Sequence, residues 1–173
     1  MQIKTERLTI TTFFPDMAQA VYENSQDEDT RRFMPDEVYD SVEEAREAIA
    51  FLMSRYDTTD GPFVYPIITN ADGKNIGYVQ LCKLELEEVS WEIGYHIAKN
   101  FTGKGYATEA VKAFLPAIAK KLNIEEVYGI CLAENLASVR VLEKCGFTQI
   151  YTGTGNYQGQ DAQIIKAIWK NYN

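Results

Sequence analysis

The sequence predicts a mixed α/β (α+β) fold, in which a β-sheet is flanked by helices. Helical and strand-like patterns alternate along all 173 residues, without repeats or low-complexity linkers. The Asp-Gly pair in NADGK, residues 70–74, is a strong signal for a hairpin between two strands. With 46% hydrophobic and 24% charged residues, the composition is that of a globular protein, so we expect a single domain over residues 1–173.

The individual elements follow from the period of the apolar residues and from the turn residues between them. The order is β-α-α-β-β-β-α-β-α-β-β, with strands at 7–13, 62–69, 75–86, 88–98, 125–133, 147–153 and 161–170 and helices at 17–25, 41–56, 107–122 and 135–145. The helix at 41–56 has the strongest signal, because Ser41 and Glu44 have the spacing of a capping box. Pro116 lies inside the third helical pattern and leaves a kink or an early break open there.

Charge and cysteine content exclude several classes of protein. The net charge of −8 argues against nucleic acid as a partner, since phosphate backbones need a basic surface. No apolar run reaches the roughly 18 residues of a membrane span, and the first residues lack the apolar core of a signal peptide, so we expect a cytoplasmic protein without a membrane partner. Cys82, Cys131 and Cys145 lack the spacing of a zinc site, and we expect buried free thiols and no metal.

The segment NFTGKGYATEA, residues 100–110, joins a glycine-rich turn to the start of a helix. Gly103 and Gly105 allow backbone N–H groups to converge, and a helix beginning near Ala107 adds the positive end of its dipole. This pattern predicts an anion site, most naturally for phosphate. For the turn alone, a plain strand-to-helix connection remains the alternative.

Two known phosphate-binding motifs do not fit this turn. A Walker loop needs a glycine where Ala98 stands and a serine or threonine after Lys104, where Gly105 follows instead. A dinucleotide fingerprint needs a third glycine at the position of Thr108. Neither nucleotide fold is therefore expected.

The turn resembles the acyl-CoA loop of the GCN5-related N-acetyltransferases (GNAT), Gln/Arg-x-x-Gly-x-Gly/Ala, with Asn100 in place of Gln or Arg. AENLASVRVLEKCGF, residues 133–147, resembles the Asn-x-x-Ser motif of the branch that contains ribosomal-protein N-terminal acetyltransferases (RimJ/RimL-type). TERLTI and DGKNIGYVQL are similar to that branch too. The resemblance covers nearly the whole chain and implies a GNAT fold, with a mixed, mostly antiparallel sheet of about seven strands and about four helices.

The resemblance implies an acetyl-CoA-dependent N-acetyltransferase that acetylates a primary amine directly. The residues that it assigns to acetyl-CoA are His96, Ile97 and Ala98 beside the pantetheine arm, Gly103, Lys104, Gly105, Tyr106, Ala107 and Thr108 around the pyrophosphate, Asn135 on the pantetheine arm, and Arg140 and Lys144 near the 3′-phosphate. For the last two, ordinary solvated charges on a helix are the alternative.

The catalytic residues are also assigned by resemblance. Much of the superfamily has a tyrosine as general acid where this chain has Leu142, whereas the ribosomal branch has a serine that corresponds to Ser138. A helix-capping role for Ser138, with water as the acid, stays open. Glu92 is the leading general base, with a plain strand position as the alternative, and His96 is the second choice.

The acceptor is expected to be the α-amine of a protein or peptide N-terminus. An α-amine with a pKa of about 8 is partly neutral at cytoplasmic pH and needs only a modest base, unlike a lysine with a pKa of about 10.4. The acidic segment 25–44 suggests a cationic acceptor, or else a solvated surface. A small amine of the polyamine or aminoglycoside kind and a CoA-binding module without turnover remain alternatives. Homodimers are common in the family, and a homodimer is therefore a possible state that nothing in this sequence proves.

Overall fold

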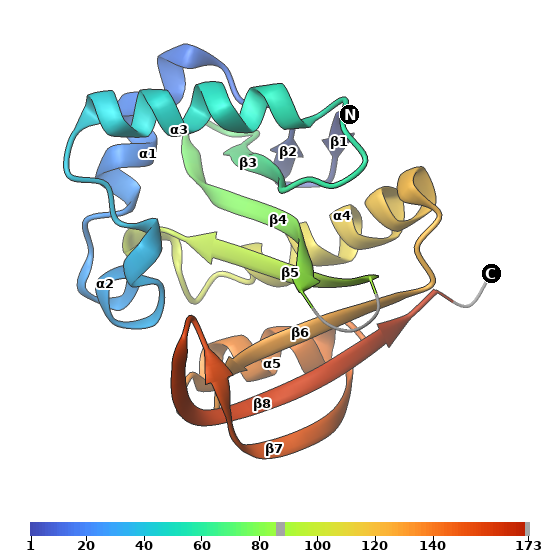
Figure 1. Ribbon diagram of the computed structural model, residues 1–173. Helices are drawn as coiled ribbons and strands as arrows, with labels where there is room; N and C mark the ends of the chain where they lie inside the picture. The colour runs from blue at the N-terminus through green and yellow to red at the C-terminus, as the bar shows by residue number, and fades with distance from the viewer. Residues whose placement is uncertain (86–88, 172–173) are drawn as a thin grey trace.

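The computed structural model describes residues 1–85 and 89–171, and it contains one eight-stranded sheet with the order β1-β2-β3-β4-β5-β6-β8-β7 (Figure 1). The strands are β1 (Ile3–Lys4), β2 (Leu8–Ile10), β3 (Phe63–Thr69), β4 (Asn75–Glu85), β5 (Val89–Ile97), β6 (Glu126–Leu132), β7 (Thr148–Tyr157) and β8 (Gln160–Lys170). All neighbouring pairs are antiparallel except β5 and β6. The strand ends predicted at Leu86 and Glu88 lie outside the described residues.

Helices cover both faces of this sheet. They are α1 (Ala18–Asn24), α2 (Glu28–Phe33), α3 (Val42–Arg55), α4 (Tyr106–Leu122) and α5 (Leu136–Lys144), with 3₁₀ turns η1 (Pro15–Met17), η2 (Pro35–Glu37) and η3 (Lys99–Phe101). Figure 1 shows α1, α2 and α3 on the near face and α4 and α5 behind the sheet. Within the described part of the chain, no helix has the length and apolarity that a membrane crossing requires.

The predicted fold class is confirmed, with two corrections to the element count. The first predicted strand, at 7–13, is only three residues long, and the short strand β1 precedes it. The helix α2 was not predicted, because six residues are too few to show an apolar period. Its signal is local instead: the Asp27 carboxylate accepts the Thr30 N–H at 3.0 Å as an N-cap, and acidic residues precede basic ones along the helix.

The local turn and cap signals are confirmed. In the β3–β4 hairpin Gly73 has a φ of 67°, and its N–H donates to the Thr69 carbonyl at 2.9 Å. At the start of α3 the Ser41 hydroxyl accepts the Glu44 N–H at 3.1 Å. Pro116 lies inside α4 and does not break it. The proline removes one backbone hydrogen-bond donor, but the buried side chains before and after it keep the helix packed on the sheet.

The core holds α4 against the middle of the sheet. Phe114 and Ile118 of α4 are fully buried, as are Phe63, Tyr65 and Leu81 of the strands beneath. The rings of Tyr65 and Phe114 lie 5.4 Å apart, within the range of favourable aromatic packing. This packing fixes the first turn of α4 directly after the end of β5.

The two parallel strands β5 and β6 separate soon after they meet. Within the described residues their register contains one pair, Glu92 opposite Tyr128. Figure 1 shows them diverging toward their C-terminal ends. The sheet therefore opens into a V, and no described strand pairs with the backbone of β5 beyond Ile93 on that side.

Candidate active site

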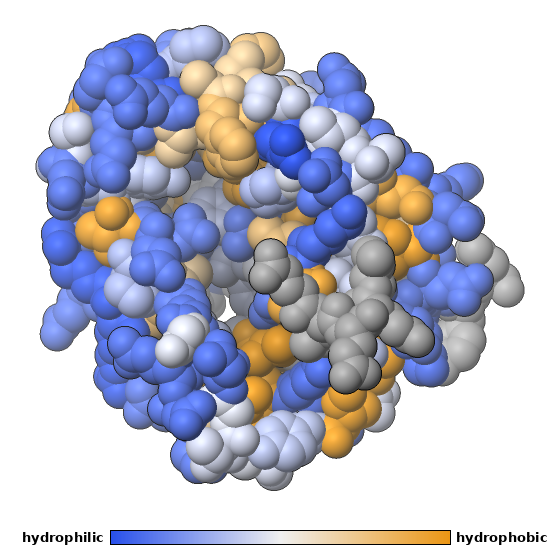
Figure 2. Space-filling model, in the orientation of Figure 1, coloured by the Kyte–Doolittle hydropathy of each residue, from blue (hydrophilic) through white to orange (hydrophobic). Residues whose placement is uncertain are grey.

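The open V forms one wall of a cavity of about 730 Å³. Its lining comes from β5, β6, α2, the first turn of α4, α5 and the β7–β8 turn. Figure 2 shows the same face of the molecule hollowed at its centre. Two contacts bridge the mouth of the V: the Tyr157 hydroxyl donates to the Phe33 carbonyl at 3.0 Å, and Arg32 lies 3.0 Å from the Glu134 carboxylate.

The first turn of α4 presents free N–H groups to this cavity. Gly103 and Gly105 have φ angles of 74° and 81°, and Gly105 is the N-cap residue. No side chain of the described residues caps the helix, and its first intrahelical bond runs from the Glu109 N–H to the Gly105 carbonyl. Both glycines line the cavity, as do Tyr106, Ala107 and Thr108. An anion at this helix start would receive several N–H groups and the helix dipole.

Arg7 braces this turn from the N-terminal segment. Its Nε and Nη2 lie 2.6 Å from the Glu109 carboxylate, and its Nη1 donates to the Lys104 carbonyl at 2.8 Å. The guanidinium also lies 4.6 Å from the centre of the Tyr106 ring. Partial burial would raise the pKa of Glu109, but hydrogen bonds from Thr5 and Arg7 hold it below its usual value. Arg7 was missed as a site residue, because 102 positions separate it from Glu109.

The free edge of β5 supplies further polar groups. The Ala98 N–H donates to the Ile76 carbonyl at 2.8 Å, on the β4 side. Because N–H groups alternate between the two edges of a strand, those of Tyr95 and Ile97 point into the V. His96 and Ile97 line the cavity, whereas Ala98 and Lys104 are not among its lining residues.

The helix α5 borders the opposite side of the cavity. Asn135 is its N-cap, and the side-chain oxygen accepts the Ser138 N–H at 3.1 Å. Arg140 and Lys144 are exposed and lie on the cavity wall. The structure therefore brings Asn135, Arg140 and Lys144 to the same cavity as the α4 turn.

Glu92 lies at the point where the V opens. Burial raises its pKa to about 7, although a hydrogen bond from the Ile130 backbone and the charge of Lys166 act in the other direction. Its side chain alternates with those of Ile93 and Tyr95, so it faces the α1–α3 side of the sheet. A carboxyl group with this pKa can accept a proton near neutral pH.

Ser138 lies across the cavity next to a tyrosine of β5. Its hydroxyl is 2.8 Å from the Tyr95 hydroxyl, which also lies 3.1 Å from the Ser138 carbonyl. Burial raises the pKa of Tyr95 well above its usual value, so the phenol stays protonated. Leu142 fills space against Gly129, where it leaves no room for a β-carbon. Tyr95 was missed because its partner is 43 residues away.

His96 is held in place by α2. Its Nε2 lies 2.9 Å from the Thr30 hydroxyl and 3.8 Å from the Asp27 carboxylate. Burial lowers the pKa of His96, against the opposing effect of Asp27, so the neutral ring predominates at neutral pH. The ring is thus part of the contact between α2 and β5, with its Nε2 already engaged.

Few carboxylates of the acidic segment 25–44 reach the cavity. Asp27, Asp29 and Glu37 line it. Asp27 caps α2, and Asp29 pairs with Lys99. Glu37 forms no ion pair with any of the described residues. Burial raises its pKa, and hydrogen bonds with Tyr78 and Gln80 act in the other direction. No group of three or more His, Cys, Asp or Glu residues suited to a metal ion occurs in the described ranges.

A free helix start and an open strand edge beside a carboxylate of raised pKa are features that a group-transfer enzyme can use. The chain belongs to the GNAT acetyltransferases: the family model "Acetyltransferase (GNAT) domain" matches residues 7–148. It is an N-acetyltransferase of this family, whose members use acetyl-CoA as the donor. This agrees with the fit of the α4 turn to a phosphate group.

Named relatives and solved structures resemble the chain over most of its length. The uncharacterized N-acetyltransferase YnaD of Bacillus subtilis is 35% identical over 147 residues, which are 84% of this chain and 82% of the relative. A GNAT-family acetyltransferase from Bacillus anthracis is 26% identical with a TM-score of 0.81 and covers 98% of both chains. RimL, a ribosomal α-N-protein acetyltransferase in complex with coenzyme A, has a TM-score of 0.79 at 17% identity, again over 98% of both chains.

Proposed function

We propose that this acetyltransferase modifies the α-amine of a peptide or protein N-terminus. The observation that carries the proposal is the position and pKa of Glu92, at the opening of the V, with a value of about 7. An α-ammonium group with a pKa of about 8 can pass its proton to this carboxylate at a cost of about 1.4 kcal/mol. A lysine near 10.4 would cost more than about 4 kcal/mol.

The donor half of the reaction uses the first turn of α4 and the edge of β5. The pyrophosphate would bind the N–H groups that follow Gly105, and the pantetheine arm would lie along the N–H and carbonyl groups of Tyr95 and Ile97. Arg140 and Lys144 would reach the 3′-phosphate from α5. In this arrangement the thioester would lie between Glu92 and Ser138, which line the same cavity.

The transfer step then needs one base and one acid. Glu92 first takes the ammonium proton, directly or through water, and passes it to solvent. The neutral amine then attacks the thioester carbon, the carbon–sulfur bond breaks, and the second amine proton leaves to Glu92. The departing thiolate takes a proton from the Ser138 hydroxyl, which Tyr95 orients and which solvent reprotonates. Asn135 holds the first turn of α5, and with it Ser138, in register.

The two alternatives have weaker support. A polyamine acceptor would use several free carboxylates, but Asp29 is paired with Lys99 and Asp27 caps a helix. A CoA-binding module without turnover was suggested by Leu142 in place of a tyrosine. The phenol of Tyr95 lies beside Ser138 and provides another hydroxyl group there, so the lack of a tyrosine at position 142 argues less strongly against turnover.

A thiol-release assay with acetyl-CoA tests the proposal. We expect the tripeptide Gly-Gly-Gly to be acetylated on its α-amine, and an otherwise equal peptide with a blocked N-terminus and one lysine to react at least about tenfold more slowly. Faster reaction of spermidine or of the blocked peptide would overturn the N-terminal assignment. No thiol release with any amine, despite measurable CoA binding, would favour the binding module.

A further inference from the structure

A second, smaller cavity lies beside the first. It measures about 240 Å³ and lies between α1, α3 and β4, on the face of the sheet toward which Glu92 points. Its walls are mainly apolar and include Phe13, Val21, Ile49, Leu52 and Val64. An engineered apolar cavity of about 150 Å³ is large enough to bind benzene, so this one can hold a phenyl ring or a branched aliphatic group.

The two cavities share a wall of mostly polar side chains. Thr30, Glu37, Gln80, Cys82 and His96 line both. A group that enters the small cavity from the large one therefore passes the carboxylate of Glu37. Glu37 is half-buried, its hydrogen bonds are with the uncharged side chains of Tyr78 and Gln80, and no cation of the described residues pairs with it. An ammonium group beside it would supply an opposite charge and favour its ionised form.

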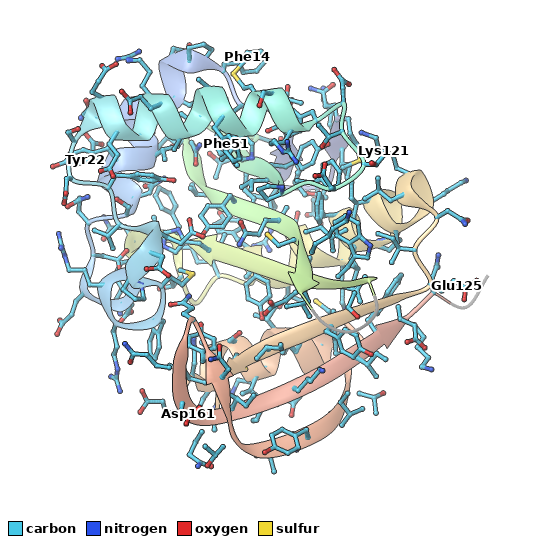
Figure 3. The ribbon with its side chains drawn as sticks, viewed as in Figure 1. Phe14, Tyr22, Phe51, Lys121, Glu125 and Asp161 are labelled. Carbon is cyan, nitrogen blue, oxygen red and sulfur yellow. The ribbon has the colours of Figure 1, made fainter. Side chains whose placement is uncertain are left out.

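The small cavity also has an aromatic residue at its rim. Phe51 of α3 lines the cavity and is 55% exposed, although large apolar side chains are usually covered. Figure 3 labels Phe51 on α3, above β4, and the space-filling view has hydrophobic residues at the same edge of the hollow (Figure 2). A bound apolar group would cover part of this ring.

We propose that the preferred acceptor is an amine that carries an aromatic or branched aliphatic group. This apolar group occupies the small cavity while the amine lies between Glu37 and Glu92. This inference rests on the proposed function and narrows it to chains whose first residue is apolar, such as phenylalanine or leucine. The polar wall between the cavities would bind the amine, and the small apolar cavity would bind the apolar group attached next to it. A small apolar amine that is not part of a peptide offers the same chemical groups. The experiment below distinguishes such an amine from a peptide N-terminus.

Ala48 and Ala50 of α3 provide a matched pair of variants. Ala48 lines the small cavity, whereas Ala50 is exposed and lines neither cavity. In A48W the indole would fill the space meant for the acceptor's apolar group, without touching the α4 turn or the catalytic side chains. A50W places the same residue on the opposite side of the helix. F51A removes part of the rim and cannot overpack the core.

The experiment measures acetylation of Phe-Gly-Gly, Leu-Gly-Gly, Gly-Gly-Gly and 2-phenylethylamine. For the unchanged protein we expect kcat/KM to be at least about tenfold higher for Phe-Gly-Gly than for Gly-Gly-Gly. A48W should remove this preference, with the rate on Gly-Gly-Gly and the affinity for CoA within about twofold of the parent. F51A should reduce the preference, and A50W should keep it. The rates with 2-phenylethylamine and Phe-Gly-Gly are compared after correction for the neutral fraction of each amine, because an alkylamine has a higher pKa than an α-amine. Equal corrected rates mean that the protein recognises the ring alone, and a lower corrected rate for 2-phenylethylamine means that it recognises the peptide too.

The failure of this inference differs from the failure of the proposed function. Equal rates with Phe-Gly-Gly and Gly-Gly-Gly, or an equal loss of both in A48W, would overturn the apolar acceptor and leave N-terminal acetylation intact. If no tripeptide reacts, the proposed function is wrong. Calorimetry of the CoA-saturated protein then decides the inference: tighter binding of Phe-Gly-Gly than of Gly-Gly-Gly supports it, and equal binding overturns it.

Discussion

At the scale of single residues, the protonation state of Glu92 should control the rate. Its pKa of about 7 makes it a base only above that pH, whereas an α-amine stays largely protonated up to about pH 8. Glu92→Gln should therefore lower kcat/KM by about 10²-fold or more in this window, and the deficit should shrink toward lower pH, where the parent carboxyl is protonated. The measurement is the pH profile of kcat/KM, with CoA affinity expected to stay unchanged.

Glu125→Gln is the matched control for this prediction. Glu125 is exposed, and Figure 3 shows it at the far end of the molecule from α2, just before β6 begins. Its loss should leave the pH profile as it is. Parallel profiles for the parent and Glu92→Gln would assign Glu92 to structure and leave water as the base.

The pair of hydroxyls on Ser138 and Tyr95 gives a second prediction. Ser138→Ala removes the proposed proton donor to the leaving sulfur and should lower kcat. The loss should be at most about 10²- to 10⁴-fold, and smaller where water replaces the hydroxyl. Tyr95→Phe keeps the ring but releases the Ser138 hydroxyl, so kcat should fall less and the affinity for CoA should hold. Single-turnover rates, in which chemistry is isolated, are the measurement. Full activity of both variants would leave solvent as the acid.

At the scale of elements, the start of α4 should decide CoA binding. Gly105→Val introduces a β-branched residue at a φ of 81° and adds bulk where the pyrophosphate would bind. We expect the affinity for CoA to fall at least about tenfold in calorimetry. Gly73→Val is the control, because its φ of 67° gives similar strain in a hairpin outside the cavity. Equal loss of affinity in both variants would show that strain alone is responsible.

The brace between the N-terminal segment and α4 can be tested in the same way. Arg7→Ala removes the hydrogen bonds to Glu109 and to the Lys104 carbonyl, so the turn loses its support from behind. We expect the affinity for CoA to fall about three- to tenfold, with kcat at saturating donor nearly unchanged. Arg46→Ala breaks an exposed pair with Glu43 on α3 and should change neither. A fall in kcat without a change in affinity would contradict the positioning role.

At the scale of the whole molecule, local signals predicted the fold well. The Asp-Gly hairpin and the capped helix α3 each depend on residues a few positions apart, and both are confirmed. The glycine turn at Gly103 and Gly105 was identified for the same reason. The helix α2 was too short for a period, and its signal was a single N-cap.

The arrangement of the site was less accessible from sequence. The pairing of Tyr95 with Ser138, the brace from Arg7 to Glu109 and the shared wall at Glu37 all join segments that are far apart in the chain. Resemblance predicted Glu92 as the base, whereas its raised pKa depends on burial where β5 and β6 separate. Such features require the folded sheet.

The opening between β5 and β6 has a consequence for amide hydrogen exchange. Interior strands of a sheet normally protect every amide, but β5 is an interior strand with one unprotected edge. In the protein without CoA, the amides of Tyr95 and Ile97 should exchange quickly with solvent. The amide of Ala98 should exchange slowly, because it is hydrogen-bonded to the Ile76 carbonyl. Saturating CoA should slow the first two by supplying the missing acceptors, and the amide of Tyr65 in β3 should not respond. Unchanged exchange rates in β5 would mean that CoA does not form hydrogen bonds along the free edge of this strand.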